Sequence, residues 1–90
     1  MIKANYKISD SVIWEKVADE MIVFKLSGGQ YYRFNNTGLI VWEGLVDQLP
    51  DEAMVKRIES EFGGKPENIR RDVTTFINEL LSEDLIRSNA

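Results

Sequence analysis

The spacing of the apolar residues changes at Asn35-Asn36-Thr37-Gly38, and this change constrains the fold more than any other feature of the chain. Before it, Ile22, Phe24 and Leu26 alternate with other residues, as expected of a strand with one buried face. The apolar residues that recur after it at helical spacing are Leu39, Trp42, Leu45 or Val46, and Leu49. The sequence therefore predicts strands followed by helices.

The first part of the chain is expected to be extended, because residues 6 to 26 are rich in β-branched and aromatic types. Ser27-Gly28-Gly29 is a turn that accepts positive φ. Residues 30 to 34 then return as the next strand of a hairpin. In that strand Tyr32 and Phe34 share one face, which we expect to be in the core, and Tyr31 and Arg33 share the other.

Three helices are expected after the strands. Asn36 or Thr37 is expected to cap the first helix, and Leu49-Pro50-Asp51 to end it and open the second. Gly63-Gly64 marks the end of the second helix, and Pro66 the start of the third. The apolar stripe of the second helix is Met54, Val55, Ile58 and Phe62. The stripe of the third helix is Ile69, Val73, Phe76, Ile77, Leu80 and Leu81.

The expected fold class is α+β: a three-stranded antiparallel sheet in the N-terminal part, followed by three α-helices. This arrangement is winged helix-turn-helix-like, with Leu85-Ile86-Arg87 packing back as a short tail and Trp42 packing under the sheet. The chain has 90 residues, of which 43% are hydrophobic, so we expect one domain over residues 1–90.

The residue types that the chain lacks argue against catalysis. It contains no cysteine and no histidine, which excludes thiol nucleophiles, thiolate metal sites and the commonest general base. It also contains no Gly-rich phosphate-binding motif. We therefore expect no enzymatic activity, no cofactor and no bound metal.

Charge and hydropathy indicate which partners to expect. Residues 36 to 90 carry six Lys or Arg against eleven Asp or Glu, a balance of −5, and this surface would repel phosphates. We therefore expect no nucleic-acid partner. No apolar run approaches about 18 residues, so we expect no membrane span. The N-terminus, MIKANYKISDS, lacks the features of a signal peptide, which predicts a cytoplasmic protein.

The strand over residues 30 to 34 is a candidate for binding a peptide. It passes directly into a helix, and at a sheet margin its backbone N–H and C=O groups would be unpaired on one side. An extended peptide can add to such an edge, with main-chain hydrogen bonds giving affinity and side-chain pockets giving specificity.

Two segments resemble the PqqD family, the small proteins of pyrroloquinoline quinone biosynthesis. They are GGQYYRFNNTGLIVWEGL, residues 28 to 45, and EFGGKPENIRRDVTTFINELLSEDLI, residues 61 to 86. The resemblance extends from about Ser11 to Ile86. It implies a recognition element that binds the leader of a ribosomally made precursor peptide as an added strand, over a groove shared with the third helix, and presents it to a modifying enzyme.

The peptide-binding residues expected from this reading are Lys25, Gln30, Tyr31, Tyr32, Arg33, Phe34, Ile69, Arg70, Val73, Phe76, Ile77 and Leu80. The expected enzyme partner is a radical S-adenosylmethionine enzyme in a quinone-cofactor pathway, or a leader peptidase and a cyclase in a lasso-peptide pathway. Because an unpaired edge strand can pair with itself, a monomer and a weak dimer are both open. The alternatives are a winged-helix DNA-binding regulator and a non-catalytic structural subunit of a modifying enzyme.

Overall fold

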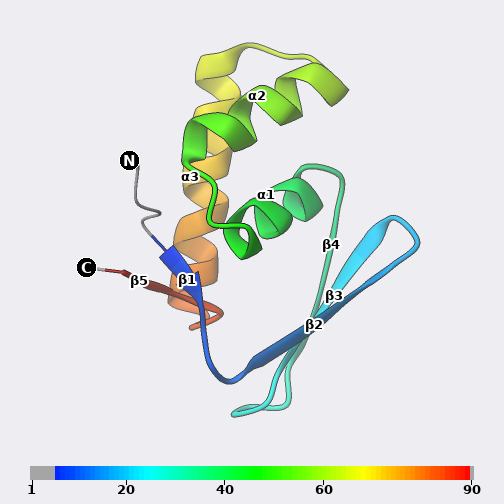
Figure 1. The fold of residues 1–90 in the computed structure, drawn as a ribbon, viewed down its shortest axis with the longest axis vertical. Helices are drawn as coiled ribbons and strands as arrows, with labels where there is room; N and C mark the ends of the chain where they lie inside the picture. Colours follow the sequence, from blue (N-terminus) through cyan, green and yellow to red (C-terminus); the bar gives the residue numbers. More distant parts are fainter. Residues whose placement is uncertain (1–5, 90) are drawn as a thin grey trace.

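The computed structural model describes residues 6–89 of the chain (Figure 1). The expected order of strands and helices is confirmed, and two short strands are added to it. The elements are β1 (Tyr6–Ile8), β2 (Val12–Val17), β3 (Glu20–Lys25), β4 (Tyr31–Asn35), α1 (Asn36–Val46), α2 (Asp51–Phe62), α3 (Pro66–Ser82) and β5 (Ile86–Ser88).

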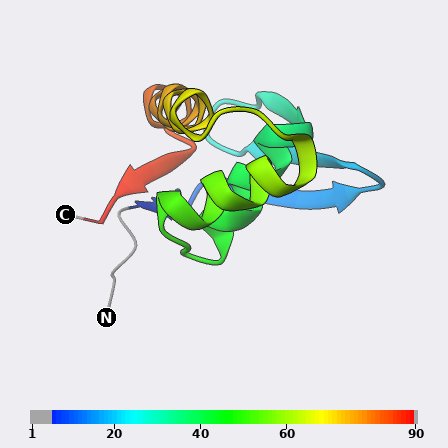
Figure 2. The same ribbon diagram turned by 90° about the horizontal axis from the view of Figure 1, so that it is seen from above.

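The strands form two antiparallel sheets. The three-stranded sheet has the order β2-β3-β4, so β3 is central and β4 is an edge strand. The strands β1 and β5 pair separately, which brings the two ends of the described chain together. The predicted short tail is thus confirmed, and it forms a strand. In Figures 1 and 2 the helices gather on one side of the three-stranded sheet, with α1 next to β3 and β4 and α2 packed against α3.

The core lies between the helices and the inner face of the sheet. Trp42 of α1 is fully buried, as predicted, and its ring contacts those of Trp14 and Phe34 at centroid distances of 5.9 and 5.6 Å. Trp14 belongs to the edge strand β2 and stays 40% exposed. The aromatic contacts therefore attach both edge strands of the sheet to one helix.

The face of β3 expected to be buried is the wrong one. Met21 and Val23 are 4% and 0% exposed and face the helices, whereas Leu26 is 56% exposed, and Ile22 and Phe24 are only partly buried. Both faces of this segment carry apolar residues, so their alternation alone does not identify the buried face. The register against β4 decides it, because Met21 and Val23 lie opposite Phe34 and Tyr32, which pack against the core.

The capping prediction for the first helix is also wrong. The N-cap residue is Asn35, and it makes no side-chain capping hydrogen bond. Asn36 has φ +50°, a left-handed conformation that asparagine adopts more readily than most residues. The predicted boundaries of the other helices are confirmed, with Pro50 before α2, Gly63 at its end and Pro66 at the start of α3.

Candidate functional site

The hydrogen bonding of β3 and β4 determines which backbone groups face the free edge. The N–H of Lys25 donates to the carbonyl of Gln30 at 2.9 Å. Bonded and non-bonded pairs alternate along an antiparallel ladder, so Tyr32 and Phe34 are the β4 residues whose backbone groups point toward β3. The N–H and C=O groups of Tyr31 and Arg33 consequently point away from the sheet, toward the free edge.

The side chains of Tyr31 and Arg33 lie on the outer face of the sheet, opposite the helices. Tyr31 is 73% exposed and contacts Phe24 at a ring-centroid distance of 4.6 Å. The side chain of Arg33 is 70% exposed, and its Nε lies 3.6 Å from a carboxylate oxygen of Glu20. The predicted division of faces in this strand is confirmed, since Tyr32 and Phe34 pack against the core.

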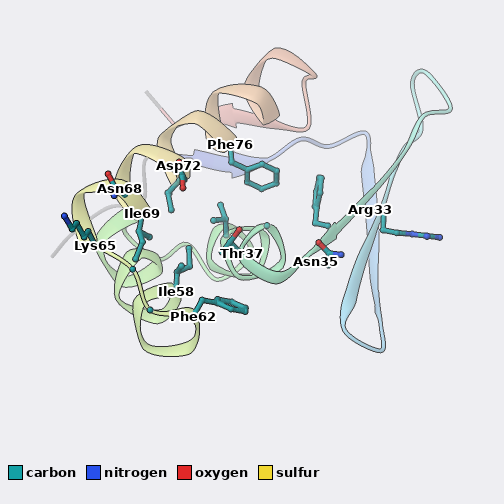
Figure 3. A pocket seen from close by; sticks show the side chains of 16 residues that line it. Arg33, Asn35, Thr37, Ile58, Phe62, Lys65, Asn68, Ile69, Asp72 and Phe76 are labelled. Carbon is teal, nitrogen blue, oxygen red and sulfur yellow. The ribbon is translucent and has the colours of Figure 1, made fainter.

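A cleft of about 480 Å³ lies beside the end of β4, between the start of α1 and the facing parts of α2 and α3 (Figure 3). The floor is mostly apolar, and polar side chains stand along the rim. The residues that line it are Arg33, Phe34, Asn35, Thr37, Gly38, Val41, Ile58, Phe62, Gly63, Gly64, Lys65, Asn68, Ile69, Asp72, Val73 and Phe76.

The absence of a side chain at Gly38 lets the cleft approach the first turn of α1. A Cβ atom at this position would lie 3.4 Å from Cβ of Phe34 and 3.5 Å from the ring of Phe76. The Phe34 and Phe76 rings meet edge to face, with centroids 5.1 Å apart. These two aromatic side chains therefore join β4 to α3 across the cleft and define its apolar floor.

Phe62 lines the cleft, although the sequence pattern predicts that its side chain is buried in the core. Its position in the apolar stripe of α2 predicts burial, yet the side chain is 54% exposed. In Figure 3 its ring projects from the end of α2 into the space beside α1. Its position in the sequence could have indicated this exposure. Phe62 is the last residue of α2, directly before Gly63-Gly64, where the apolar stripe no longer faces the core.

The cleft collects five of the twelve predicted peptide-binding residues: Arg33, Phe34, Ile69, Val73 and Phe76. Ile77 and Leu80 are each 2% exposed, pack in the core and do not line the cleft, so their part in peptide binding stays a prediction. They follow Val73 on the same helical stripe, beyond the part of α3 that lines the cleft. Asn68 and Asp72, on the cleft side of α3, were missed because no pattern separates them from other exposed polar residues.

At the end of β4 away from the cleft, hydrogen bonds to Glu83 bridge the space between this strand and α3. Tyr32 donates its hydroxyl to a carboxylate oxygen of Glu83 at 2.7 Å, and Lys25 Nζ donates to the backbone carbonyl of Glu83 at 2.8 Å. The hydrogen bond to Glu83 raises the pKa of Tyr32, with burial and the charge of Glu83 adding to it. Lys25 and Tyr32 are thus engaged with the end of α3, and the open cleft lies at the Arg33 end of the strand.

Arg70 is directed toward α2. Its guanidinium donates to both carboxylate oxygens of Glu52, at 2.6 and 3.0 Å. This bidentate pair lowers the pKa of Glu52 and raises that of Arg70. Arg70 does not line the cleft, so the structure does not bring it together with the other predicted residues. Gln30 lies just before β4, at the hairpin turn.

Within residues 6–89 no group of three or more acidic side chains is arranged to hold a metal ion. Over the same residues, no helix has the length and apolar character needed to cross a membrane. The N-terminal segment used for the cytoplasmic prediction includes residues 1–5, which lie outside the described residues.

Comparisons with known proteins identify a family and two similar structures. The family model described as coenzyme PQQ synthesis protein D (PqqD) matches residues 20–86. The structure of TbiB1 in complex with the TbiA(beta) leader peptide is similar at 27% identity and a TM-score of 0.85, over 93% of this chain and 98% of that chain. The search of curated proteins found no match.

A second similar structure is lasso peptide synthetase B1 complexed with the leader peptide. It has 15% identity and a TM-score of 0.85, over 93% of this chain and 99% of that chain. At this identity the likeness supports the α+β fold alone.

Proposed function

This chain belongs to the PqqD family, and on that basis we propose that it binds the leader segment of a ribosomally synthesised precursor peptide. The observation that carries the proposal is the position of the cleft directly beside the free edge of β4. The likeness to TbiB1, whose structure contains a leader peptide, supports it over nearly the whole chain. The fold therefore offers both the backbone groups and the apolar floor that an extended peptide requires.

In this proposal the leader adds to β4 as a fourth strand of the sheet. Its backbone hydrogen-bonds to the outward N–H and C=O groups of Tyr31 and Arg33. Every second side chain of the leader then faces the helices, and the one beside Phe34 enters the apolar cleft. The Tyr32–Glu83 hydrogen bond bounds the groove at its other end.

We further propose that the protein acts without catalysis, as one recognition domain over residues 1–90. Its part is to hold the leader while a modifying enzyme acts on the rest of the precursor. That enzyme would be a radical S-adenosylmethionine enzyme, or a leader peptidase and a cyclase. A cytoplasmic setting and a monomer or weak dimer remain the predictions made from the sequence.

Of the twelve residues first expected to bind the peptide, we keep those at the free edge and in the cleft: Tyr31, Arg33, Phe34, Ile69, Val73 and Phe76. To them we add Phe62, because it is exposed and lines the cleft. Gln30 stays a prediction, because its carbonyl accepts a hydrogen bond from Lys25 of β3 and it does not line the cleft. We assign Lys25, Tyr32 and Arg70 to contacts within the fold.

The charge of the helical half disfavours a DNA-binding regulator. Residues 36 to 90 carry a net charge of −5, and the guanidinium of Arg70 is paired with Glu52. The winged helix-turn-helix description stays a prediction, and a structural-subunit role is not favoured by the leader-bound neighbours.

The test is a titration of the protein into a fluorescently labelled leader peptide, taken from a small open reading frame beside this gene. We expect saturable binding, lost in Arg33→Pro and retained within about five-fold in Arg33→Ala, because proline removes a backbone donor at the free edge but no donor of the β3 ladder. Circular dichroism checks that both variants fold. Equal affinities of the two variants would argue against strand addition.

A further inference from the structure

The outer face of the sheet is open to solvent, and an added strand would extend it. Strands β2, β3 and β4 place the side chains of alternate residues on this face, and the helices cover only the other face (Figure 2). A peptide paired with β4 has the same alternation, so half of its side chains would lie on the outer face beside Tyr31 and Arg33.

Arg33 has a distinctive place on this face. Among the outward side chains of β2, β3 and β4 it is the one cation, and the carboxylate of Glu20 lies beside it. Its contact with Glu20 is 3.6 Å long at Nε, beyond the ordinary hydrogen-bond range of about 3.2 Å. With five N–H donors and a side chain that is 70% exposed, Arg33 keeps most of its hydrogen-bonding capacity for a further partner.

We infer that Arg33 is a specificity-determining residue that selects an acidic side chain at the outward position of the bound leader beside it. This inference rests on the proposed leader binding and adds the chemical class of one leader residue to it. Side chains directly across a strand pair lie about 4.5–5.5 Å apart at Cβ, close enough for an arginine and a carboxylate to form a charge-assisted hydrogen bond.

The same register determines which way the leader residues next to the acidic one face. Residues on either side of the acidic one face the helices, and the one beside Phe34 meets the apolar cleft. The leader segment that binds here is therefore expected to contain an apolar residue adjacent to an Asp or Glu. The exposed position of Arg33 limits the preference to about three-fold in affinity, the size typical of a cross-strand charge pair.

The test uses the labelled leader peptide from the neighbouring open reading frame, synthesised with Glu, Gln and Lys placed in turn at each position. We expect one position at which Glu binds about three-fold more tightly than Gln, and Lys more weakly than both. In Arg33→Gln the difference between Glu and Gln should disappear. Arg71→Gln is the matched control, since it removes an equal charge from an exposed position of α3, and it should keep the preference.

The outcomes separate this inference from the proposed function. Saturable binding with no position that prefers Glu, or a preference that persists in Arg33→Gln, overturns the role of Arg33 and leaves leader binding intact. No saturable binding by a folded protein overturns both. Loss of the preference in Arg33→Gln but not in Arg71→Gln supports the assignment.

Discussion

Tyr32 of β4 donates a hydrogen bond of 2.7 Å to Glu83, which follows the last turn of α3. This contact links the edge strand to the C-terminal end of the helix, while at the other end of the same strand the space between them opens into the cleft. The two elements that form the candidate groove are thus linked by a hydrogen bond at one end, and at the other by the contact of Phe34 with Phe76 on the floor of the cleft. The length of strand with an open groove is thereby limited to the part around Arg33.

Removing the hydroxyl in Tyr32→Phe is expected to lower the free energy of unfolding by about 0.5–1 kcal/mol at neutral pH, the net value of one hydrogen bond near the surface. The folded-state pKa of Tyr32 is raised, so its contribution is present below the ordinary tyrosine pKa of about 10 and is lost as pH rises through the raised value. Denaturant unfolding of the wild type and of Tyr32→Phe at pH 7 and pH 11 measures the difference in their free energies of unfolding. An equal difference between wild type and variant at both pH values would contradict the assignment.

Replacing Phe62 is expected to weaken leader binding while leaving the stability of the fold almost unchanged. Because its side chain is 54% exposed, Phe62→Ala should change the free energy of unfolding by less than about 0.5 kcal/mol. Leader affinity should fall by roughly five-fold, since an apolar contact in the cleft is lost. Val55→Ala on the same helix is the control: Val55 is 2% exposed and does not line the cleft, so stability should fall by about 1–3 kcal/mol with affinity retained. A large stability loss in Phe62→Ala would show that its exposure is misjudged.

Arg70→Ala is expected to leave leader affinity unchanged within about two-fold, because the Arg70–Glu52 pair is an exposed contact between α2 and α3. Because the pKa of Glu52 is lowered, the pair contributes to the stability of the folded state at pH values above the ordinary glutamate pKa. That contribution is lost as the pH falls through the lowered value. Titration of the leader into both proteins checks the affinity. A much larger loss would place Arg70 in the binding site after all.

Two glycines of α1 are expected to respond in opposite directions to alanine. A Cβ atom at Gly44 would lie 2.6 Å from Cγ of Met54, which is 1% exposed, so Gly44→Ala should cost about 1–2 kcal/mol of stability. At Gly38 the nearest atoms are 3.4 Å away, and Gly38→Ala should stabilise the helix by about 0.5–1 kcal/mol. Thermal and denaturant unfolding of Gly44→Ala, Gly38→Ala and the wild type measure these changes in stability. Similar effects at both sites would contradict the close approach of α1 to α2.

The local part of the fold was predictable from the sequence. The alternation of Tyr31 and Arg33 with Tyr32 and Phe34 identified the two faces of β4, because side chains in a strand alternate. Gly63-Gly64 and Pro66 likewise fixed the boundary between the last two helices, since each has a strong backbone preference.

The long-range part was not predictable. The buried face of β3 depends on its partner strand, since both faces of that segment are apolar. The pairing of β1 with β5 joins residues at opposite ends of the chain, which no local pattern indicates. The exposure of Phe62 and the closure of the groove by Glu83 depend on how the helices end against the sheet. The candidate site was therefore predicted as two elements, and the structure identifies the cleft between them.

Amide hydrogen exchange on β4 tests the central claim most directly. In the free protein the N–H groups of Tyr32 and Phe34 are expected to exchange slowly, because they point toward β3, and those of Tyr31 and Arg33 to exchange fast. On saturation with the leader peptide, the N–H groups of Tyr31 and Arg33 are expected to become protected while those of Tyr32 and Phe34 change little. Leader binding with fast exchange retained at both Tyr31 and Arg33 would contradict strand addition at this edge.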